Sequence, residues 1–307
     1  MLKKVSFQNY RCLKELTLSL GPLTVVVGAN ATGKSTVLQG LQFPGGLEPT
    51  DAWRHESGLS IRIAFEFDGQ PNFTKISDAR GRNSFEGNRS GRSSQLLHLD
   101  LNALRQQNQV AEQQSLAQDG SNLTNVFATL SRRKQEDMVR EFCALVPMFS
   151  DVNHKPTEDG FHTLVFQDRW SGAAFGPHEV SDGTMLVLAY LLAQHQELQV
   201  DLLAIEEPER GLHPYLLGEI VGLFRKMARG EVGTKPIQIV LATHSAELLD
   251  HLEPEEVRFL SRNQQDGSVG IETISEEEPN WQQAFREHEG SLGNLWLAGG
   301  HGGVPSS

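Results

Sequence analysis

Eight residues, Gly28 to Ser35 (hereafter the P-loop), constrain the fold of this chain more than any other segment. They read G-A-N-A-T-G-K-S and fit the pattern G-x-x-x-x-G-K-[ST]. The apolar run Leu23 to Val27 before them predicts a buried strand, and the residues after Gly33 have helical character. A glycine-rich turn between a strand and a helix can surround phosphate groups, so the sequence predicts an α/β fold with a nucleoside triphosphate site.

Each residue type in the P-loop suits that chemistry. The glycines let backbone N–H groups close around phosphate oxygens, Lys34 reaches the β and γ phosphates, and Ser35 ligates Mg²⁺. The implied cofactors are therefore ATP and Mg²⁺. The candidate nucleotide-binding residues in this segment are Gly28, Asn30, Ala31, Thr32, Gly33, Lys34, Ser35 and Thr36.

A second predicted strand, Leu202 to Ile205, ends in the carboxylates Glu206 and Glu207. Ligands of open α/β sheets bind at the carboxyl ends of the strands, which places both acids at the predicted site. The segment resembles a Walker B motif. That resemblance assigns Mg²⁺, or a water bound to it, to Glu206 and the polarisation of the attacking water to Glu207. Aspartate is more usual at position 206, and the longer Glu206 side chain favours a metal contact through water.

Two short motifs complete the set of candidate residues. Ser181 opens S-D-G-T before an apolar helix, and His244 lies in T-H-S after a predicted strand. Taken alone, Ser181 reads as a helix cap and His244 as an ordinary core or surface histidine. Their order and spacing indicate more, because Glu207 follows Ser181 by 26 residues and His244 follows Glu207 by 37. The set resembles the signature, Walker B, D-loop and switch-histidine elements of ABC-type ATPases.

The closer resemblance is to the RecF-like, SMC-head-like predicted ATPases of the AAA family, which include the ATPase part of OLD nucleases. It extends over nearly the whole chain. The segments that carry it are Asn9-Tyr10-Arg11, the P-loop, Asp119-Gly120-Ser121-Asn122-Leu123, S-D-G-T from Ser181, I-E-E-P-E-x-G-L-H-P from Ile205 to Pro214, T-H-S, and the tail Gly302-Gly303-Val304-Pro305.

The resemblance implies a single ABC-type ATPase domain over residues 1–307, with a β and helical insertion at about 70–160. The fold would be a P-loop NTPase of ABC/SMC-head type, with a mixed central sheet, an antiparallel β subdomain and an inserted helical subdomain. Two subunits would sandwich two ATP molecules, so that Lys34 and Glu207 of one copy face Ser181 and Gly183 of the other. His244 would contact the γ-phosphate, Arg11 would approach the nucleotide, and Glu209 to His213 would form the D-loop.

The resemblance also suggests an ATPase whose dimerisation gates a partner effector, with antiphage defence as the setting. Only 63 residues follow His244, so we expect any nuclease to reside on another chain. One alternative is a DNA-repair ATPase that loads on DNA. Another is a nucleotide-dependent scaffold that does not hydrolyse ATP, suggested by Glu206 in place of aspartate.

Charge bears on the DNA alternative. The net charge of −12 argues against indiscriminate nucleic-acid binding, but residues 1–150 carry 17 Lys and Arg against 14 acidic residues, whereas residues 151–307 carry 10 against 25. The first half is therefore the better DNA surface. Its basic candidates lie in the predicted loop 77–94, which reads equally as a solvated segment without function: Arg80, Arg82, Arg89 and Arg92.

The remaining features predict a cytoplasmic protein without a membrane span. The longest apolar run, Met185 to Ala193, has nine residues, and Cys12 and Cys143 are too few for a disulfide framework. Periodicity predicts strands at 61–67, 161–166, 202–205 and 237–242, a helix at 181–196, and mostly helix over 96–149 with a break at Asp119-Gly120.

Overall fold

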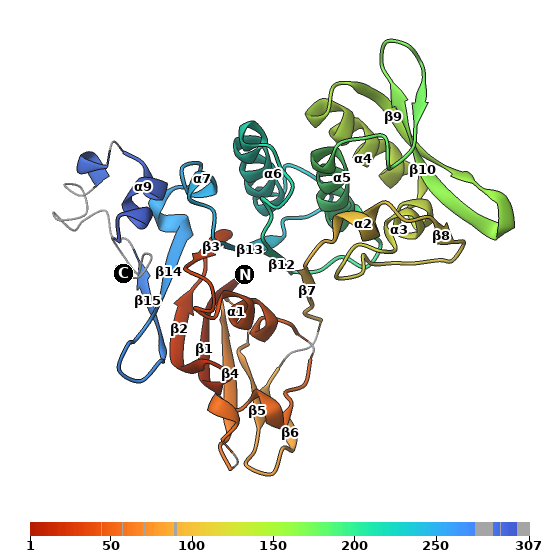
Figure 1. Cartoon of the computed structure of the whole chain (residues 1–307). Coiled ribbons are helices and arrows are strands. Elements are labelled where there is room, and N and C mark those ends of the chain that lie inside the picture. The colour runs from red at the N-terminus through yellow and green to blue at the C-terminus, as the bar shows by residue number, and fades with distance from the viewer. Residues whose placement is uncertain are drawn as a thin grey trace. The chain divides into compact units, whose positions relative to one another are not determined.

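The computed structural model describes residues 1–43, 45–56, 58–69, 71–88, 91–273, 285–288 and 290–299. The chain divides into two compact units, which Figure 1 shows in the context of the whole chain. Unit 1 comprises residues 1–96, 201–209 and 238–307, and unit 2 comprises residues 97–200 and 210–237. Segment 201–209 of unit 1 contains Glu206 and Glu207, and segment 238–307 contains His244. All three residues therefore belong to the same unit as the P-loop.

The P-loop follows a strand of a six-stranded sheet in unit 1, ordered β15-β14-β3-β13-β12-β7. The strands are β3 (Leu23–Val27), β7 (Ser94–Leu97), β12 (Leu202–Glu206), β13 (Gln238–Thr243), β14 (Val257–Arg262) and β15 (Val269–Thr273). β12, β13, β3 and β14 run parallel, and β15 is antiparallel to β14. Since β3, β13 and β12 are parallel neighbours, their carboxyl ends place the P-loop, Thr243 and Glu206 at one edge of the sheet.

A second, antiparallel sheet in unit 1 has the order β2-β1-β4-β5-β6. Its strands are β1 (Leu2–Tyr10), β2 (Leu13–Ser19), β4 (Ile61–Phe67), β5 (Phe73–Ser77) and β6 (Asn83–Gly87). One hydrophobic core joins both sheets to helix α1 (Lys34–Gly40) and includes Phe7, Phe65, Val37 and Val240. The helix that begins in the P-loop is therefore anchored by residues from both sheets.

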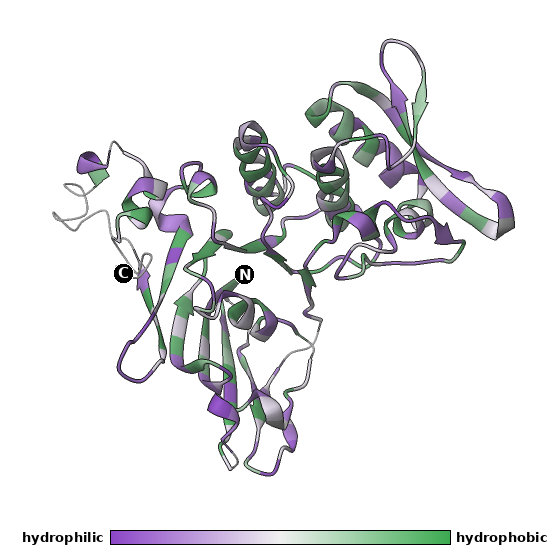
Figure 2. Ribbon diagram, in the orientation of Figure 1, coloured by the Kyte–Doolittle hydropathy of each residue, from purple (hydrophilic) through white to green (hydrophobic). Residues whose placement is uncertain are grey.

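Unit 2 contains five helices and a small sheet in which β10 pairs with β8, β9 and β11. The helices are α2 (Leu101–Leu104), α3 (Leu123–Thr129), α4 (Arg132–Leu145), α5 (Asp182–His195) and α6 (Leu217–Arg229). The strands are β8 (Asn108–Gln109), β9 (Phe149–Pro156), β10 (Phe161–Asp168) and β11 (Ala174–Phe175). Every residue of α5 from Gly183 to His195 is buried, and Figure 2 shows this helix as largely hydrophobic.

Short elements complete the described structure. In unit 1, helices α7 (Ala246–Leu249) and α9 (Leu292–Leu297) are each capped by a serine side chain, from Ser245 and Ser291. Single 3₁₀ turns lie at Pro49–Asp51, Trp53–His55, Glu158–Gly160, Pro214–Leu216 and Pro254–Glu256. No helix among the described residues has the length and hydrophobicity needed to cross a bilayer.

The predicted fold class is confirmed, and so are the strands at 61–67, 161–166, 202–205 and 237–242, and the helix at 181–196, within a residue or two at their ends. Two predictions were wrong. Residues 77–94 are not one loop, because β6 lies within them; most of its side chains are exposed, so the strand leaves no hydrophobic alternation. Residues 105–122 hold no helix: Asn108 and Gln109 form β8, which pairs with β10, and the Asn122 side chain bonds the backbone of Ala117 and Ser115, which competes with helical bonding there.

Candidate functional site

The P-loop has the backbone that its glycines allow. Gly33 and Ala31 adopt left-handed conformations, with φ of 94° and 62°. A Cβ atom added at Gly28 would lie 2.5 Å from Thr32 Oγ1 and 2.7 Å from the carbonyl oxygen of Leu260, so only glycine fits there. Thr32 closes the turn by donating to the Ala29 carbonyl at 2.8 Å. The loop therefore has a compact fold that side chains at its glycine positions would disrupt.

Lys34 links the P-loop to the acids that follow β12. Its Nζ donates to the carbonyl oxygens of Gly28 at 2.7 Å and Ala29 at 2.9 Å. Burial lowers the pKa of Lys34, against the opposing charges of Glu207, Glu209 and Glu206, which raise it. Both motifs belong to unit 1 and follow neighbouring parallel strands of its sheet.

Glu207 has a strained backbone. It is a non-glycine residue with φ of 46°, and it precedes Pro208, a position at which backbone freedom is already reduced. Such conformations cost about 1–3 kcal/mol and are concentrated at functional sites. Its N–H donates to the Ala242 carbonyl at 2.8 Å, and its Oε1 lies 3.2 Å from His244 Nδ1. The predicted water-polarising acid therefore meets the predicted switch histidine.

The predicted metal residues are Glu206 and Ser35. Glu206 is the last residue of β12 and is half-buried, and Ser35 is the second residue of α1 and is exposed. A carboxylate and a hydroxyl are oxygen donors of the kind Mg²⁺ takes, with water and phosphate supplying the rest. Glu206 and Ser35 therefore suit Mg²⁺ by donor type.

A cavity of about 580 Å³ lies in unit 1 and is lined by residues from outside the P-loop. Its wall includes Arg11, Cys12, Trp53, Arg54 and Arg262. Two of these residues reach the P-loop: Arg262 Nε donates to the Ala31 carbonyl at 2.7 Å, and Cys12 Sγ lies 2.9 Å from where a Cβ on Gly33 would be. The volume is within the range of small-molecule sites.

Arg11 forms part of this cavity wall. It is the residue that the family resemblance predicts to approach the nucleotide. Its Nε donates to Asp51 Oδ1 at 2.7 Å, and its guanidinium also donates to Gln39. Its φ of 51° is left-handed, and its guanidinium lies 5.4 Å from the centre of the Tyr10 ring. Arg11 is therefore held in place by Tyr10 of β1, by Asp51 and by Gln39 of α1.

The signature residues Ser181 and Gly183 belong to unit 2. Ser181 is exposed and caps α5, since its side chain accepts the Thr184 N–H at 3.1 Å. A Cβ added at Gly183 would lie 2.9 Å from Leu216 Cδ1. The structure thus gathers the P-loop, the acids and His244 in one unit and Ser181 with Gly183 in the other.

Arg105 fixes the segment that leads into the signature motif. Its guanidinium donates to Asp182 Oδ1 at 2.5 Å, to the Val180 carbonyl at 3.1 Å and to the Pro177 carbonyl. The side chain is only 11% exposed. Nothing in the spacing of the sequence motifs pointed to this residue.

Two of the described arginines of the predicted loop, Arg82 and Arg92, contact other side chains. Arg80 and Arg82 lie at the β5–β6 turn, where Arg82 pairs with Asp78 at 2.7 Å. The Arg92 guanidinium lies 3.8 Å from the centre of the Phe67 ring. Arg89 lies outside the described residues, as does the tail Gly302 to Pro305.

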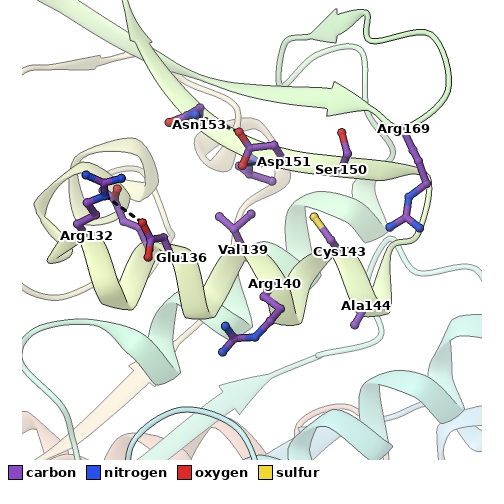
Figure 3. A pocket seen from close by; sticks show the side chains of 12 residues that line it. Arg132, Glu136, Val139, Arg140, Cys143, Ala144, Ser150, Asp151, Asn153 and Arg169 are labelled. Carbon is purple, nitrogen blue, oxygen red and sulfur yellow. Dashed lines mark hydrogen bonds and ion pairs between the residues drawn. The ribbon is translucent and has the colours of Figure 1, made fainter.

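A cavity of about 740 Å³ in unit 2 lies between α4 and β9 (Figure 3). Two of its arginines are paired along α4: Arg132 with Glu136 at 2.9 Å, and Arg140 with Asp137 at 2.5 Å. None of the residues predicted from the sequence lines it. We assign it no role in the site.

Sequence reasoning missed several residues that the structure brings to the site. Trp53, Arg54 and Arg262 follow no motif, and only the fold brings them together with Arg11 in one cavity wall. Glu209 and Thr243 are joined by a hydrogen bond of 2.6 Å. Both lie inside the motifs I-E-E-P-E and T-H-S, so the motifs could have drawn attention to them, although not to their contact.

Comparison with protein families identifies two matching models. One, described as "AAA domain, putative AbiEii toxin, Type IV TA system", matches residues 92–250, which is more than half of the chain. Another, described as "AAA ATPase domain", matches residues 1–48. Together the two models cover the P-loop, the signature motif, the twin glutamates and His244.

Comparison with individual proteins gives a short match and several similar folds. The OLD nuclease of Thermus scotoductus is 42% identical over 67 residues, which is 22% of this chain and 12% of that protein. An SMC head bound to the C-terminal winged-helix domain of ScpA has a TM-score of 0.62 at 12% identity, over 90% of this chain and 98% of that one. The SMC head of Thermotoga maritima has a TM-score of 0.58 at 13% identity, over 89% and 99%. The fold is therefore of the SMC-head type.

Proposed function

The chain belongs to the AAA domain family whose model matches residues 92–250, and from this membership and the site geometry we propose that it is a Mg²⁺-dependent ATPase. One observation carries the proposal. The P-loop with Lys34 follows β3, and the pair formed by Glu207 and His244 follows β12 and β13, so both lie at the carboxyl ends of neighbouring parallel strands. A lysine that can bind phosphate, a carboxylate and an imidazole therefore lie at the same edge of the sheet.

Each of these residues then has a defined task. Lys34, which donates to the carbonyls of Gly28 and Ala29 at the start of the P-loop, would bind the β and γ phosphates. Ser35 and Glu206 would hold Mg²⁺, which would supply charge neutralisation at the phosphates. Glu207 orients and polarises the attacking water, and His244 is placed to hold Glu207 and contact the γ-phosphate.

The cavity beside the P-loop is the proposed site of the nucleoside. Its position is fixed by Cys12 and Arg262, which border both the cavity and the P-loop. Arg11 and Arg54 offer guanidinium planes to a base or ribose, and the Arg54 guanidinium lies 4.9 Å from the buried Trp53 ring. This supports the assignment of Arg11 to nucleotide binding.

We propose that two copies form the complete hydrolytic site. Ser181 and Gly183 of one copy would then face Lys34 and Glu207 of the other, and the two units of each copy would be lobes of a single ATPase domain with the insertion at about 70–160. Ser181, an exposed residue whose side chain caps the 14-residue helix α5, supports this, because a helix N-terminus and a hydroxyl attract a γ-phosphate.

Glu207→Gln tests the proposal because it keeps the shape of the side chain but removes the base. We expect phosphate release to fall at least about a hundredfold and ATP to hold the variant as a dimer, measured by light scattering. Lys34→Met should abolish both ATP binding and the dimer, and Glu231→Gln, an exposed glutamate of unit 2, is the control. Unchanged phosphate release in Glu207→Gln would refute the hydrolytic assignment. ATP-dependent dimers of the unmodified protein without phosphate release would favour the scaffold alternative.

The partner we propose is an effector chain of nuclease type, with antiphage defence as the setting. The proposal is supported by the toxin–antitoxin description of the family model and by the short match to an OLD nuclease. An adjacent reading frame for a nuclease-like protein is the expected observation. A neighbourhood of DNA-repair genes would favour the DNA-loading alternative, which stimulation of ATPase activity by DNA would test directly.

A further inference from the structure

The turn that carries Glu207 is tied to the end of β13 by three contacts. The Glu207 N–H donates to the Ala242 carbonyl at 2.8 Å, and the Glu207 carboxylate lies 3.2 Å from His244. The third contact is the hydrogen bond of 2.6 Å from the Thr243 hydroxyl to Glu209 Oε1. Two neighbouring segments are therefore joined on either side of the strained residue.

The contact between Glu209 and Thr243 is the most deeply buried of the side-chain links. Thr243 is fully buried, whereas the His244 side chain is half exposed. The Thr243 hydroxyl is also used twice, since it donates to Glu209 and accepts the Ser245 N–H at 2.9 Å. Because water cannot replace a partner at a buried site, loss of this link leaves polar atoms without partners.

Glu209 is an unusual residue for a merely structural contact. Its second oxygen, Oε2, is buried and has no hydrogen-bond partner among the residues that the structure describes. Burial raises the pKa of the Glu209 carboxyl, although the hydrogen bond from Thr243 works in the opposite direction. A carboxyl retained under these conditions indicates a role that an apolar side chain could not fill.

Pro208 connects this link to the strained residue. Proline fixes its own φ near about −65° and restricts the residue before it, so the chain from Glu207 to Glu209 is stiff. A fixed position of Glu209 therefore limits the backbone of Glu207. Strained conformations persist only where the surrounding structure over-determines them.

We propose that Glu209 and Thr243 form a clamp that keeps Glu207 in its left-handed conformation, with its carboxylate at His244. Glu209 and Thr243 are positioning residues, since they act through Glu207 and His244. The consequence for turnover rests on the proposed ATPase function, whereas the consequence for the geometry of Glu207 does not.

Thr243→Val removes the hydroxyl but keeps the shape of the side chain, and Thr243→Ser restores the hydroxyl. For Thr243→Val we expect kcat to fall at least about tenfold while KM for ATP changes less than about threefold, because the clamp acts on Glu207 and not on the P-loop. Thr243→Ser should return kcat to within about threefold of the unmodified protein. The matched control is Thr124→Val, because Thr124 is also buried but its hydroxyl has no partner among the described residues.

A crystal structure of nucleotide-free Thr243→Val gives a readout that needs no activity. We expect residue 207 to leave the left-handed region, or its carboxylate to move away from His244. Retention of both features would overturn the clamp, as would a Thr243→Val kcat equal to that of the unmodified protein or a Thr243→Ser kcat as low as that of Thr243→Val. If the unmodified protein hydrolyses no ATP, the proposed function fails, but the structure of the variant still decides on the clamp.

Discussion

The imidazole Nδ1 of His244 lies 3.2 Å from the Glu207 Oε1, so the two residues form a pair. The pair joins the ends of β12 and β13, which are parallel neighbours in the sheet. Half of the His244 side chain is exposed, which leaves the imidazole accessible from the solvent side. A histidine in this position can orient the carboxylate and still reach a phosphate.

His244→Ala should therefore impair hydrolysis more than binding. We expect kcat to fall about a hundredfold, because an oriented acid–base pair is lost, with KM for ATP within about threefold. Steady-state phosphate release as a function of ATP concentration measures both constants. His251→Ala, which alters an exposed histidine of unit 1, is the control. A rise in KM at constant kcat would instead assign His244 to binding.

Lys75 makes the stability of the protein depend on pH. It is buried on β5, where its ammonium donates to the carbonyls of Gly40 and Gln42, and burial lowers its pKa to about 8, against the charge of Asp51. The unfolded lysine titrates near 10.5, so between about pH 8 and 10.5 the unfolded chain binds more protons than the folded one. The free energy of unfolding should consequently rise with pH in this window.

We expect an increase of about 2 kcal/mol between pH 7.5 and 9.5, measured by urea denaturation. Above pH 10 the buried Tyr10, whose pKa burial raises to about 12, works in the opposite direction, which sets the upper limit of the experiment. The Lys75→Met variant should lack this increase. An equal pH dependence in the variant would show that Lys75 is not its source.

Two helical glycines should respond to alanine with opposite signs. At Gly293 in α9, an added Cβ would lie 2.3 Å from the carbonyl oxygen of Ala246, and this backbone atom cannot move aside. Gly293→Ala should therefore lower the free energy of unfolding by about 1–3 kcal/mol. At Gly222 in α6 nothing lies within 4 Å of the added atom, so Gly222→Ala should raise it by about 0.5–1 kcal/mol. Urea denaturation measures both, and a loss in both variants would contradict the steric explanation.

The sequence predicted the parts of this site that depend on short local patterns. The P-loop, the twin glutamates and T-H-S each follow an apolar strand, and the parallel neighbours β3, β13 and β12 bring these segments together. The left-handed φ of Glu207 could not be predicted, because the residues that Glu207 contacts, Ala242 and His244, are distant from it in sequence. The cavity at Trp53 could not be predicted either, since it depends on how distant segments pack.

The same limit explains why the contacts of Arg105 came only from the structure. It is separated by 77 residues from Asp182, and its neighbours in sequence show no motif. Its guanidinium makes three contacts that hold the segment from Pro177 to Asp182, which leads into the signature motif. Arg105 therefore controls the position of Ser181 from a different part of unit 2.

Arg105→Ala should lower the free energy of unfolding by about 1–3 kcal/mol, because it removes the partner of two carbonyls at a site where the arginine side chain is 11% exposed, whereas the Asp182 side chain, 47% exposed, can be hydrated. It should also lower kcat for ATP at least about tenfold, since Ser181 would lose its fixed position, while binding of a fluorescent ATP analogue to the P-loop stays within about threefold. Arg105→Lys should not restore turnover, because a single ammonium cannot span all three acceptors. The control is Arg132→Ala, which removes a 91% exposed arginine paired only along α4. If Arg105→Ala weakened analogue binding as much as turnover, its effect would have to come from general unfolding, and the positioning of Ser181 would not be its cause.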